Sequence, residues 1–211
     1  MARAPLIIAL DGPAASGKGT LARRLAAHYG LRHLDTGLLY RATGLRAEAD
    51  GLDPVAAAAA LSLADLGDPQ LREDRAAQAG SRVAAISAVR DALRGLQRRF
   101  AAEPPGAVLD GRGIGTVVFP EAPVKIYVDA TLEARARRRH EELLGRGLAS
   151  IYSRVLQDMR ERDARDRGRT VAPLTPAKDA LVIDSSDIDA DQVFALAVAH
   201  IGHILPGLVA G

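Results

Sequence analysis

A lysine follows a glycine-rich loop near the start of the chain, in the stretch Gly12-Pro-Ala-Ala-Ser-Gly-Lys-Gly-Thr20. The spacing matches the pattern G-x-x-x-x-G-K, in which backbone N–H groups and a lysine ammonium surround a phosphate group. The N-terminus of the helix that follows adds partial positive charge. We therefore expect this loop to bind the phosphates of a nucleotide. The alternative is a glycine-rich turn that binds no ligand.

The residue after Lys18 departs from the commonest form of this loop. Gly19 stands where a serine or threonine usually supplies a hydroxyl group to Mg²⁺, and Thr20 comes one residue late. GTPases and motor ATPases use that hydroxyl group. The Gly-Lys-Gly-Thr form resembles nucleoside monophosphate kinases, in which the metal is held more loosely. We assign no residue as a metal ligand, and Asp35, Asp110 and Asp129 stay open as candidates.

The segments on either side of the loop predict a strand and a helix. Residues 6–10 form a continuous apolar run, as a strand buried on both faces requires. Leu21, Leu25 and Tyr29 are spaced by four residues, which places them on one helix face. Gly30 supplies a helix stop. A buried strand, a phosphate loop and a helix are therefore expected in that order.

Four further apolar runs predict four more strands, at residues 31–34, 107–109, 124–128 and 180–183. Strands that alternate with helical segments predict the α/β class, with a five-stranded parallel, doubly wound sheet. The carboxyl ends of such strands meet at one edge, where ligands bind. The polar residues that follow the runs should therefore lie near the phosphate loop. They include Asp35, Asp110, Arg112, Asp129 and Asp184.

Two stretches exceed what a simple crossover between strands requires. Residues 37–101 contain no clear strand, and we expect a helical lobe with one helix at residues 56–60 and another along residues 83–100. Residues 135–169 form an irregular, arginine-rich stretch with interleaved acidic residues. We therefore expect residues 1–211 to form a single domain, with a mobile helical lobe at 37–101 and a second mobile stretch at 135–169.

The composition limits the classes of partner. The chain has 211 residues, a net charge of +2, no cysteine and 3% aromatic residues. It has neither an apolar run of membrane-spanning length nor room for a signal peptide before the first strand. Acidic residues alternate with the arginines, which argues against nucleic-acid binding. We expect a cytoplasmic monomer without disulfides, bound to neither membrane nor nucleic acid.

Particular arginines are placed to serve phosphoryl transfer, in which a protein positions two substrates and neutralises charge. Lys18 belongs to the donor loop. Arg41 lies one helical turn beyond the Asp35-Thr-Gly37 strand end, and Arg112 lies at another strand end. Each guanidinium group can bind two phosphate oxygens at once. Arg162 and Arg169 are candidates in the second stretch, whereas we expect the side chains of three others to be solvated on helix surfaces: Arg137, Arg139 and Arg160.

The chain resembles bacterial cytidylate kinases over nearly its whole length. The resemblance rests on residues 11–20, 34–37, 40–41, 110–120, 124–130, 161–169, 172–174 and 184–186, in this order. It implies a P-loop kinase core like that of adenylate kinase, in which the lobe at 37–101 binds the acceptor and the stretch at 135–169 forms a lid. It also implies transfer of the γ-phosphoryl group of ATP to CMP or dCMP, with Mg²⁺ as the cofactor. Substrate partners would therefore be ATP and CMP or dCMP.

The resemblance also implies roles for individual residues. Catalytic roles fall to Lys18, Arg112, Arg162 and Arg169. ATP would contact Gly12, Pro13, Ala14, Ala15, Ser16, Gly17, Lys18, Gly19, Thr20 and Arg138. CMP would contact Thr36, Arg41, Ser81, Arg90, Arg112, Arg162 and Asp166, with Ser81 and Arg90 at the cytosine edge and Asp166 at the sugar.

The chain departs from the family pattern in two places. The family motif D-G-R-D ends here in Gly113, which lacks the carboxylate that helps to read the base, so we expect weaker discrimination between bases. Residues 50–80 are too short and too alanine-rich for the family's small β-rich insert. These departures leave two alternatives: a kinase of another small acceptor such as UMP or shikimate, and a nucleotide-binding protein that has lost catalysis.

Overall fold

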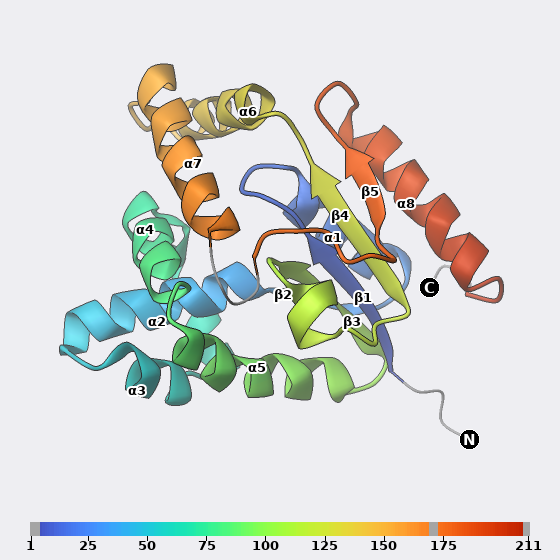
Figure 1. Ribbon diagram of the computed structural model, residues 1–211, viewed down its shortest axis with the longest axis horizontal. Helices are drawn as coiled ribbons and strands as arrows, with labels where there is room; N and C mark the ends of the chain where they lie inside the picture. Colours follow the sequence, from blue (N-terminus) through green and yellow to red (C-terminus); the bar gives the residue numbers. More distant parts are fainter. Residues whose placement is uncertain (1–4, 169–172, 209–211) are drawn as a thin grey trace.

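A parallel sheet of five strands forms the centre of the molecule in the computed structural model, which describes residues 5–168 and 173–208 (Figure 1). The strands lie in the order β2-β3-β1-β4-β5. Their bounds are Leu6–Asp11 for β1, Arg32–Asp35 for β2, Gly106–Gly111 for β3, Val124–Asp129 for β4 and Leu181–Asp184 for β5. The predicted α/β class and all five predicted strands are confirmed.

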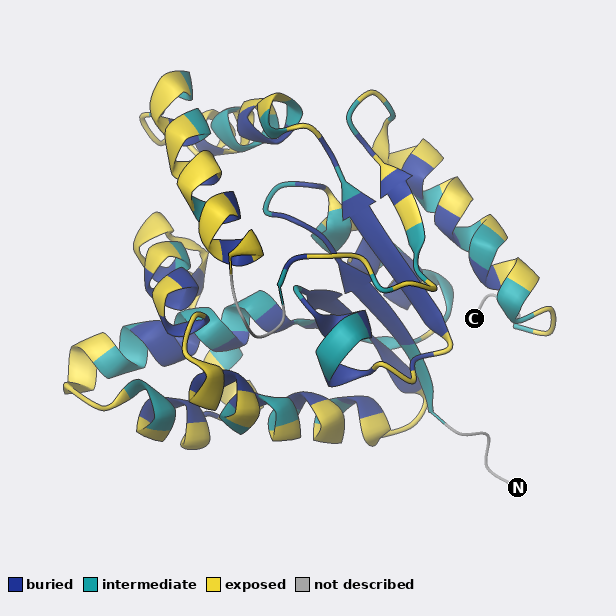
Figure 2. Cartoon of the chain, in the orientation of Figure 1, coloured by how far each residue is buried: buried dark blue, intermediate teal, exposed yellow. Residues whose placement is uncertain are grey.

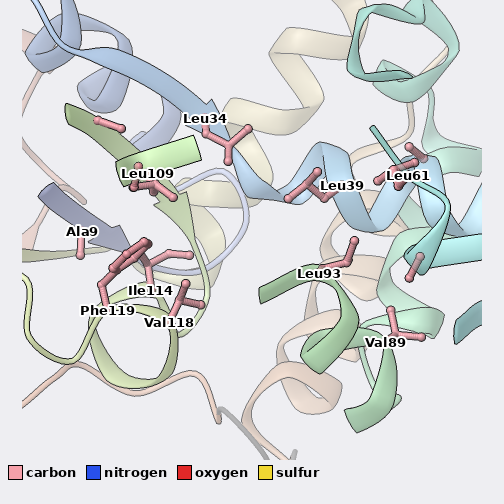
Figure 3. Close-up of a cluster of buried hydrophobic side chains, with 14 of the residues drawn as sticks. Ala9, Leu34, Leu39, Leu61, Val89, Leu93, Leu109, Ile114, Val118 and Phe119 are labelled. Carbon is pink, nitrogen blue, oxygen red and sulfur yellow. The ribbon is translucent and has the colours of Figure 1, made fainter. Parts of the chain in front are cut away.

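Helices cover both faces of this sheet. On one face, α1 (Lys18–His28) and α8 (Ala190–Ile204) pack against Ile8, Leu10 and Val108. On the other face lie α2 (Thr36–Asp50), α3 (Pro54–Ala59), α5 (Ser87–Ala102) and the π-helical turn η3 (Ile114–Val118). Figure 3 shows side chains of this second core, and Figure 2 shows how completely the central strands are buried. Burial on both faces explains the continuous apolar runs in the sequence.

The helical lobe contains two helices where a single one is predicted along residues 83–100. Val83 ends α4 (Asp74–Val83), and Ile86 precedes α5. The backbone tightens between them, with Ile86 N–H donating to the Val83 carbonyl at 3.0 Å. Arg90 Nε donates to the Ala84 carbonyl at 2.7 Å, which uses an acceptor that a continuous helix would need for its own backbone. The prediction of one helix is therefore wrong at residues 84–86.

The arginine-rich stretch at residues 135–169 is expected to be irregular, and this expectation is wrong, because most of its described residues lie in two regular helices. Helices α6 (Leu132–Gly145) and α7 (Tyr152–Arg167) pack around Ala136, Leu143, Val155 and Met159. The apolar residues that the two helices bury form only this narrow strip, so the charged residues dominate the sequence and hide the helical period.

The short segment in place of a β-rich insert is helical. Two 3₁₀ turns, η1 (Leu63–Gly67) and η2 (Pro69–Arg72), connect α3 to α4. Asp68 begins the second turn by accepting a hydrogen bond from the Gln70 N–H group at 2.8 Å. Within the described residues, the chain between β2 and β3 contains no strand. In residues 5–168 and 173–208 we find no helix with the length and apolarity that crossing a membrane requires.

Helices α2 and α4 approach closely where Gly44 faces Ala79. A Cβ atom on Gly44 would lie 2.6 Å from the Ala79 carbonyl carbon, which is backbone and cannot rotate away. We expect Gly44→Ala to lower the free energy of unfolding by about 1–3 kcal/mol through overpacking. Chemical denaturation followed by circular dichroism measures this change.

Gly95→Ala on α5 is the matched control for this substitution. There the added Cβ atom would meet only the mobile end of Arg99, at 3.3 Å. Replacing a helical glycine by alanine should then stabilise the protein, by up to about 1 kcal/mol. Equal stability changes in the two variants would contradict the proposed close contact.

Candidate active site

The phosphate loop leaves β1 and enters α1 through residues that suit its tight backbone. A Cβ atom on Gly12 would lie 2.1 Å from the Val128 carbonyl oxygen, so only glycine fits there. Gly17 precedes α1 in the left-handed conformation, with φ +89°. Among the described residues, no side chain caps the first turn of α1 at Gly17. The amide groups at the start of this helix are therefore available to an anion.

Lys18 folds back over this loop, with its Nζ atom 3.3 Å from the Pro13 carbonyl oxygen. Burial, followed by repulsion from Arg112, lowers the pKa of Lys18 to about 8, although the carboxylates of Asp110 and Asp35 partly oppose the shift. The charged ammonium group is therefore poorly compensated by the protein. A phosphate group would stabilise it.

Two carboxylates lie close to Lys18. Asp35 caps α2 by accepting a hydrogen bond from the Gly37 N–H group at 2.9 Å, and burial followed by repulsion from Asp110 raises its pKa. The Oδ1 atom of Asp110 lies 3.0 Å from Nε2 of His33. A Cβ atom on Gly19 would lie 3.3 Å from Asp110 Oδ2. The glycine that departs from the commonest loop pattern therefore gives this carboxylate access to the loop.

These carboxylates are hard oxygen donors, the ligand type that Mg²⁺ prefers. Among the described residues there is no group of three or more acidic, histidine or cysteine residues placed to hold a metal ion. Asp35 and Asp110 therefore stay candidates for contact with a hydrated Mg²⁺ ion that binds through substrate phosphates.

Asp11 joins the phosphate loop to the end of β3, a role that sequence reasoning missed. Its buried carboxylate accepts hydrogen bonds from the N–H groups of Ile114 and Gly115, both at 2.8 Å. Burial raises the pKa of Asp11, and these hydrogen bonds oppose the shift. An acidic residue at the end of an apolar strand, directly before a loop glycine, was the available signal.

A cavity lies beside the loop, between α2, α4, α7 and the end of β3. It encloses about 410 Å³, counting the space that opens to solvent. All seven residues that sequence analysis expects to contact an acceptor line it: Thr36, Arg41, Ser81, Arg90, Arg112, Arg162 and Asp166. The structure therefore brings together residues that are up to 130 positions apart in the chain.

Backbone groups orient the polar side chains from α2. Thr36 Oγ1 donates to the Asp110 carbonyl at 2.9 Å, which joins the start of α2 to the end of β3. Arg41 Nη1 donates to the Leu71 carbonyl at 2.9 Å, and burial lowers the pKa of this guanidinium group. Both residues are therefore held at the cavity wall before any ligand binds.

A second pair of side chains comes from the helices on either side of the turn at residues 84–86, Ser81 from α4 and Arg90 from α5. The guanidinium group of Arg90 lies 5.4 Å from the ring centre of Tyr40, and its Nε atom is fixed by the Ala84 carbonyl. The Ser81 hydroxyl group is buried and has no hydrogen-bond partner among the described residues. This hydroxyl group is therefore free to donate and accept hydrogen bonds at the cavity wall.

The opposite wall of the cavity carries an ion pair between β3 and α7. Arg112 Nε lies 2.5 Å from Asp166 Oδ2, and the Asp166 side chain is almost fully buried. Arg162 lies one helical turn before Asp166 and also faces the cavity. Arg169 lies outside the described residues.

The arginines of α6 divide between the site and the surface. Arg138 donates to the hydroxyl group of Ser185 at 3.0 Å, and that hydroxyl group donates to the Ser16 carbonyl of the phosphate loop at 2.9 Å. Arg137, like Arg160 of α7, is exposed, as expected. Arg139 is not simply solvated, because it pairs with Asp74 of α4 and with Glu142, and this corrects the expectation for it.

Gly113 lies next to the cavity but is not part of its lining. It precedes η3 in the left-handed conformation, with φ +89°, and its carbonyl accepts from the N–H groups of Val117 and Val118. Glycine adopts this conformation without strain, and aspartate and asparagine are among the residues that tolerate it best.

Solved structures share this fold at low sequence identity. A gluconokinase from Sinorhizobium meliloti matches with a TM-score of 0.51 and 17% identity, covering 98% of this chain and 97% of the other. An uncharacterised protein from Eubacterium ventriosum matches with a TM-score of 0.57 and 16% identity, covering 93% and 98%. These similarities support the kinase-like fold alone.

Sequence comparisons identify the family. A family model of cytidylate kinases matches residues 8–203. A cytidylate kinase of Paramagnetospirillum magneticum is 60% identical, over 93% of this chain and 97% of its own length. Those of Xanthobacter autotrophicus and Methylocella silvestris are 55% and 53% identical, over 92% and 98% of this chain and 96% and 98% of their own lengths. The chain belongs to the cytidylate kinase family.

Proposed function

We propose that the protein transfers the γ-phosphoryl group of ATP to CMP or dCMP, giving ADP and CDP or dCDP. The observation that carries the proposal is the cavity beside the phosphate loop, whose lining includes all seven residues expected to contact CMP. Family membership supports the same reaction. The loop would hold the donor, and the cavity would hold the acceptor.

The donor side would consist of residues 12–20 and Arg138. Backbone N–H groups at the start of α1 and the Lys18 ammonium would bind the phosphates of ATP. The Ser185 hydroxyl group places Arg138 close to the loop backbone at Ser16. Arg169, which lies outside the described residues, would add a further cation when both substrates are bound.

The acceptor side would bind the three parts of CMP separately. Thr36, Arg41 and Arg112 would hold its phosphate group. The Ser81 hydroxyl group, which has no hydrogen-bond partner among the described residues, would contact the cytosine edge. The guanidinium group of Arg90, held by the Ala84 carbonyl, would contact the same edge. Arg162 and Asp166 would lie at the sugar, where a carboxylate can accept hydrogen bonds from sugar hydroxyl groups.

In the reaction, an oxygen of the CMP phosphate attacks the γ-phosphorus atom, and the bond from that phosphorus to the β–γ bridging oxygen breaks. Lys18, Arg112 and Arg162 would neutralise the charge that spreads over the transferred group. Mg²⁺ supplies charge neutralisation at the β- and γ-phosphates when it is bound with ATP, and Asp35 and Asp110 would hold its water shell. All bond changes occur in the substrates, so the protein would act by positioning the two substrates and by stabilising the charge on the transferred group.

We further propose that the lobe at 37–101 and the lid at 135–169 move together to exclude water. Two contacts already join them: Arg139 pairs with Asp74, and Arg146 Nη1 donates to the Arg72 carbonyl at 3.2 Å. We also propose that the protein is a cytoplasmic monomer that binds neither nucleic acid nor membrane, since a net charge of +2 provides no large basic field for either.

An acceptor panel tests the proposed reaction. A coupled assay of ADP release with ATP and Mg²⁺ should give the highest kcat/KM with CMP and dCMP, and lower values with UMP, AMP and shikimate. Lys18→Ala should abolish most turnover, and circular dichroism should show an intact fold. Tight ATP binding without turnover of any nucleoside monophosphate would instead favour a nucleotide sensor.

The pKa of Lys18 predicts how ATP binding depends on pH. The protonated ammonium group binds phosphate, so kcat/KM for ATP should fall as the pH rises through about 8, the pKa of Lys18 in the free protein. Bound ATP should raise this pKa, because its negative charge stabilises the ammonium group.

Lysine NMR measures this pKa directly, because the chain has only three lysines: Lys18, Lys125 and Lys178. The ¹³Cε signal that disappears in Lys18→Arg should titrate near pH 8 and move upward with ATP. Titration of that signal near 10.5, the ordinary lysine value, would contradict the description of a poorly compensated cation.

Gly113→Asp tests the departure from the family motif. A carboxylate restored beside the cavity should increase the ratio of kcat/KM for CMP to that for UMP, because it adds an acceptor for the cytosine amino group. Gly113→Asn is the matched control, since it has a similar shape without the charge and also tolerates the left-handed conformation. An unchanged CMP-to-UMP ratio in Gly113→Asp would exclude this role.

A further inference from the structure

Arg135 places a guanidinium group at the junction of three segments. Its side chain is the largest among those that are fully buried in the described residues, although it lies in an arginine-rich helix in which Arg137, two positions later, is exposed. The Nε atom donates to the Ala130 carbonyl at 2.9 Å, at the start of α6. The Nη1 atom donates to the Ala14 carbonyl of the phosphate loop at 3.3 Å and to Asp163 of α7 at 3.1 Å.

The contact with Asp163 is a buried, bidentate ion pair. Arg135 Nη2 lies 2.5 Å from Asp163 Oδ2, while Nη1 reaches Oδ1. Taking both charges out of water costs several kcal/mol per ion, and apolar residues of similar volume often stabilise a protein equally well. Stability alone therefore does not explain the pair. Its planar geometry, however, fixes two segments relative to each other in a way that apolar contacts do not.

The position of Asp163 in α7 shows what this geometry would control. Arg162 precedes it directly, and Asp166 follows it by one helical turn. Asp166 forms the ion pair with Arg112 at the end of β3. A continuous series of contacts therefore leads from Ala14 in the donor loop, through Arg135, Asp163 and α7, to the wall of the acceptor cavity.

We propose that Arg135 and Asp163 are a positioning pair, which sets Arg162 and Asp166 of α7 relative to the phosphate loop. Neither residue lines the acceptor cavity, so the pair acts through its neighbours rather than on the substrate. The inference rests on the proposed phosphoryl transfer, because it concerns the alignment of donor and acceptor in that reaction. Misplacement by about 1 Å can cost a reaction about 100-fold.

Arg135→Lys tests the pair with the positive charge kept and the planar fork removed. The expected result is a folded protein whose kcat for CMP falls by about 100-fold, because α7 is misplaced relative to the phosphate loop. The contact with the Ala14 carbonyl is also lost. The KM for ATP should nevertheless change much less than kcat, because Lys18 and the backbone N–H groups at the start of α1 would still bind the phosphates. Arg137→Lys is the matched control, since Arg137 is exposed on the same helix, and it should retain wild-type kcat. A wild-type kcat in Arg135→Lys would overturn the proposal.

A double variant, Arg135→Met with Asp163→Leu, separates positioning from stability. Apolar replacement of both partners should restore the thermal midpoint to near the wild-type value, since no unpaired charge remains buried. The kcat should nevertheless stay low. Recovery of kcat together with stability, or a double variant that does not fold, would show a purely structural role and overturn the proposal.

The wild-type protein in the same assays distinguishes this inference from the proposed function. Absence of CDP formation by the wild type would reject the proposed reaction itself. An active wild type with equally active Arg135 and Asp163 variants would reject only the positioning role.

Discussion

Strand β1 is hydrogen bonded along both edges, and the rest of the site depends on this constraint. It pairs in parallel with β3 on one side and with β4 on the other, so that Asp11 lies opposite both Gly111 and Tyr127. The phosphate loop therefore starts level with the ends of two neighbouring strands. The Asp11 carboxylate then fixes the turn after Arg112 through the two N–H groups it accepts. The end of β1 therefore positions both the phosphate loop and Arg112.

Several buried groups of the same charge lie close together at the carboxyl ends of the strands, and they determine the electrostatics of the site. Lys18 and Arg41 both have lowered pKa values, because burial and neighbouring cations disfavour their charged forms. Burial, with repulsion from Asp110, likewise raises the pKa of Asp35. The negative charge of a substrate with several phosphate groups would reduce the repulsion among the cations. The positive charge of Mg²⁺ would reduce the repulsion among the carboxylates. The fold therefore holds a preorganised charge arrangement that is complementary to a bound metal–nucleotide pair.

The sequence was sufficient for the features that depend on local order. The strands were predictable because burial on both faces demands apolar runs, and the phosphate loop because its glycines have a fixed spacing. The break between α4 and α5 at residues 84–86 could not be predicted, because the helical spacing of apolar residues continues through it. The hydrogen bond that Arg90 donates to the Ala84 carbonyl comes from a side chain and leaves no local signal in the sequence. Helices α6 and α7 were not predictable either, because charged residues dominate their sequences and obscure the spacing of the few apolar residues.

Arg135 shows the limit of reasoning from sequence most clearly. In the sequence it is one of many arginines in a charged helix, and nothing in the local pattern separates it from Arg137, which is exposed. Its burial depends on Asp163, 28 positions away, and on a carbonyl group of the phosphate loop, 121 positions away. Such contacts exist only once the sheet has brought α6, α7 and the loop together. The resemblance to cytidylate kinases implied the seven cavity residues one by one, but their convergence on one cavity required the fold.

The most direct test of the two-sided site is calorimetric titration with a single molecule that carries both nucleosides, cytidine and adenosine joined by five phosphates. Such a compound should span the donor loop and the acceptor cavity, so we predict one molecule bound per chain and displacement by either ATP or CMP. Binding of two molecules per chain, or displacement by ATP alone, would contradict a site in which the loop and the cavity serve one reaction.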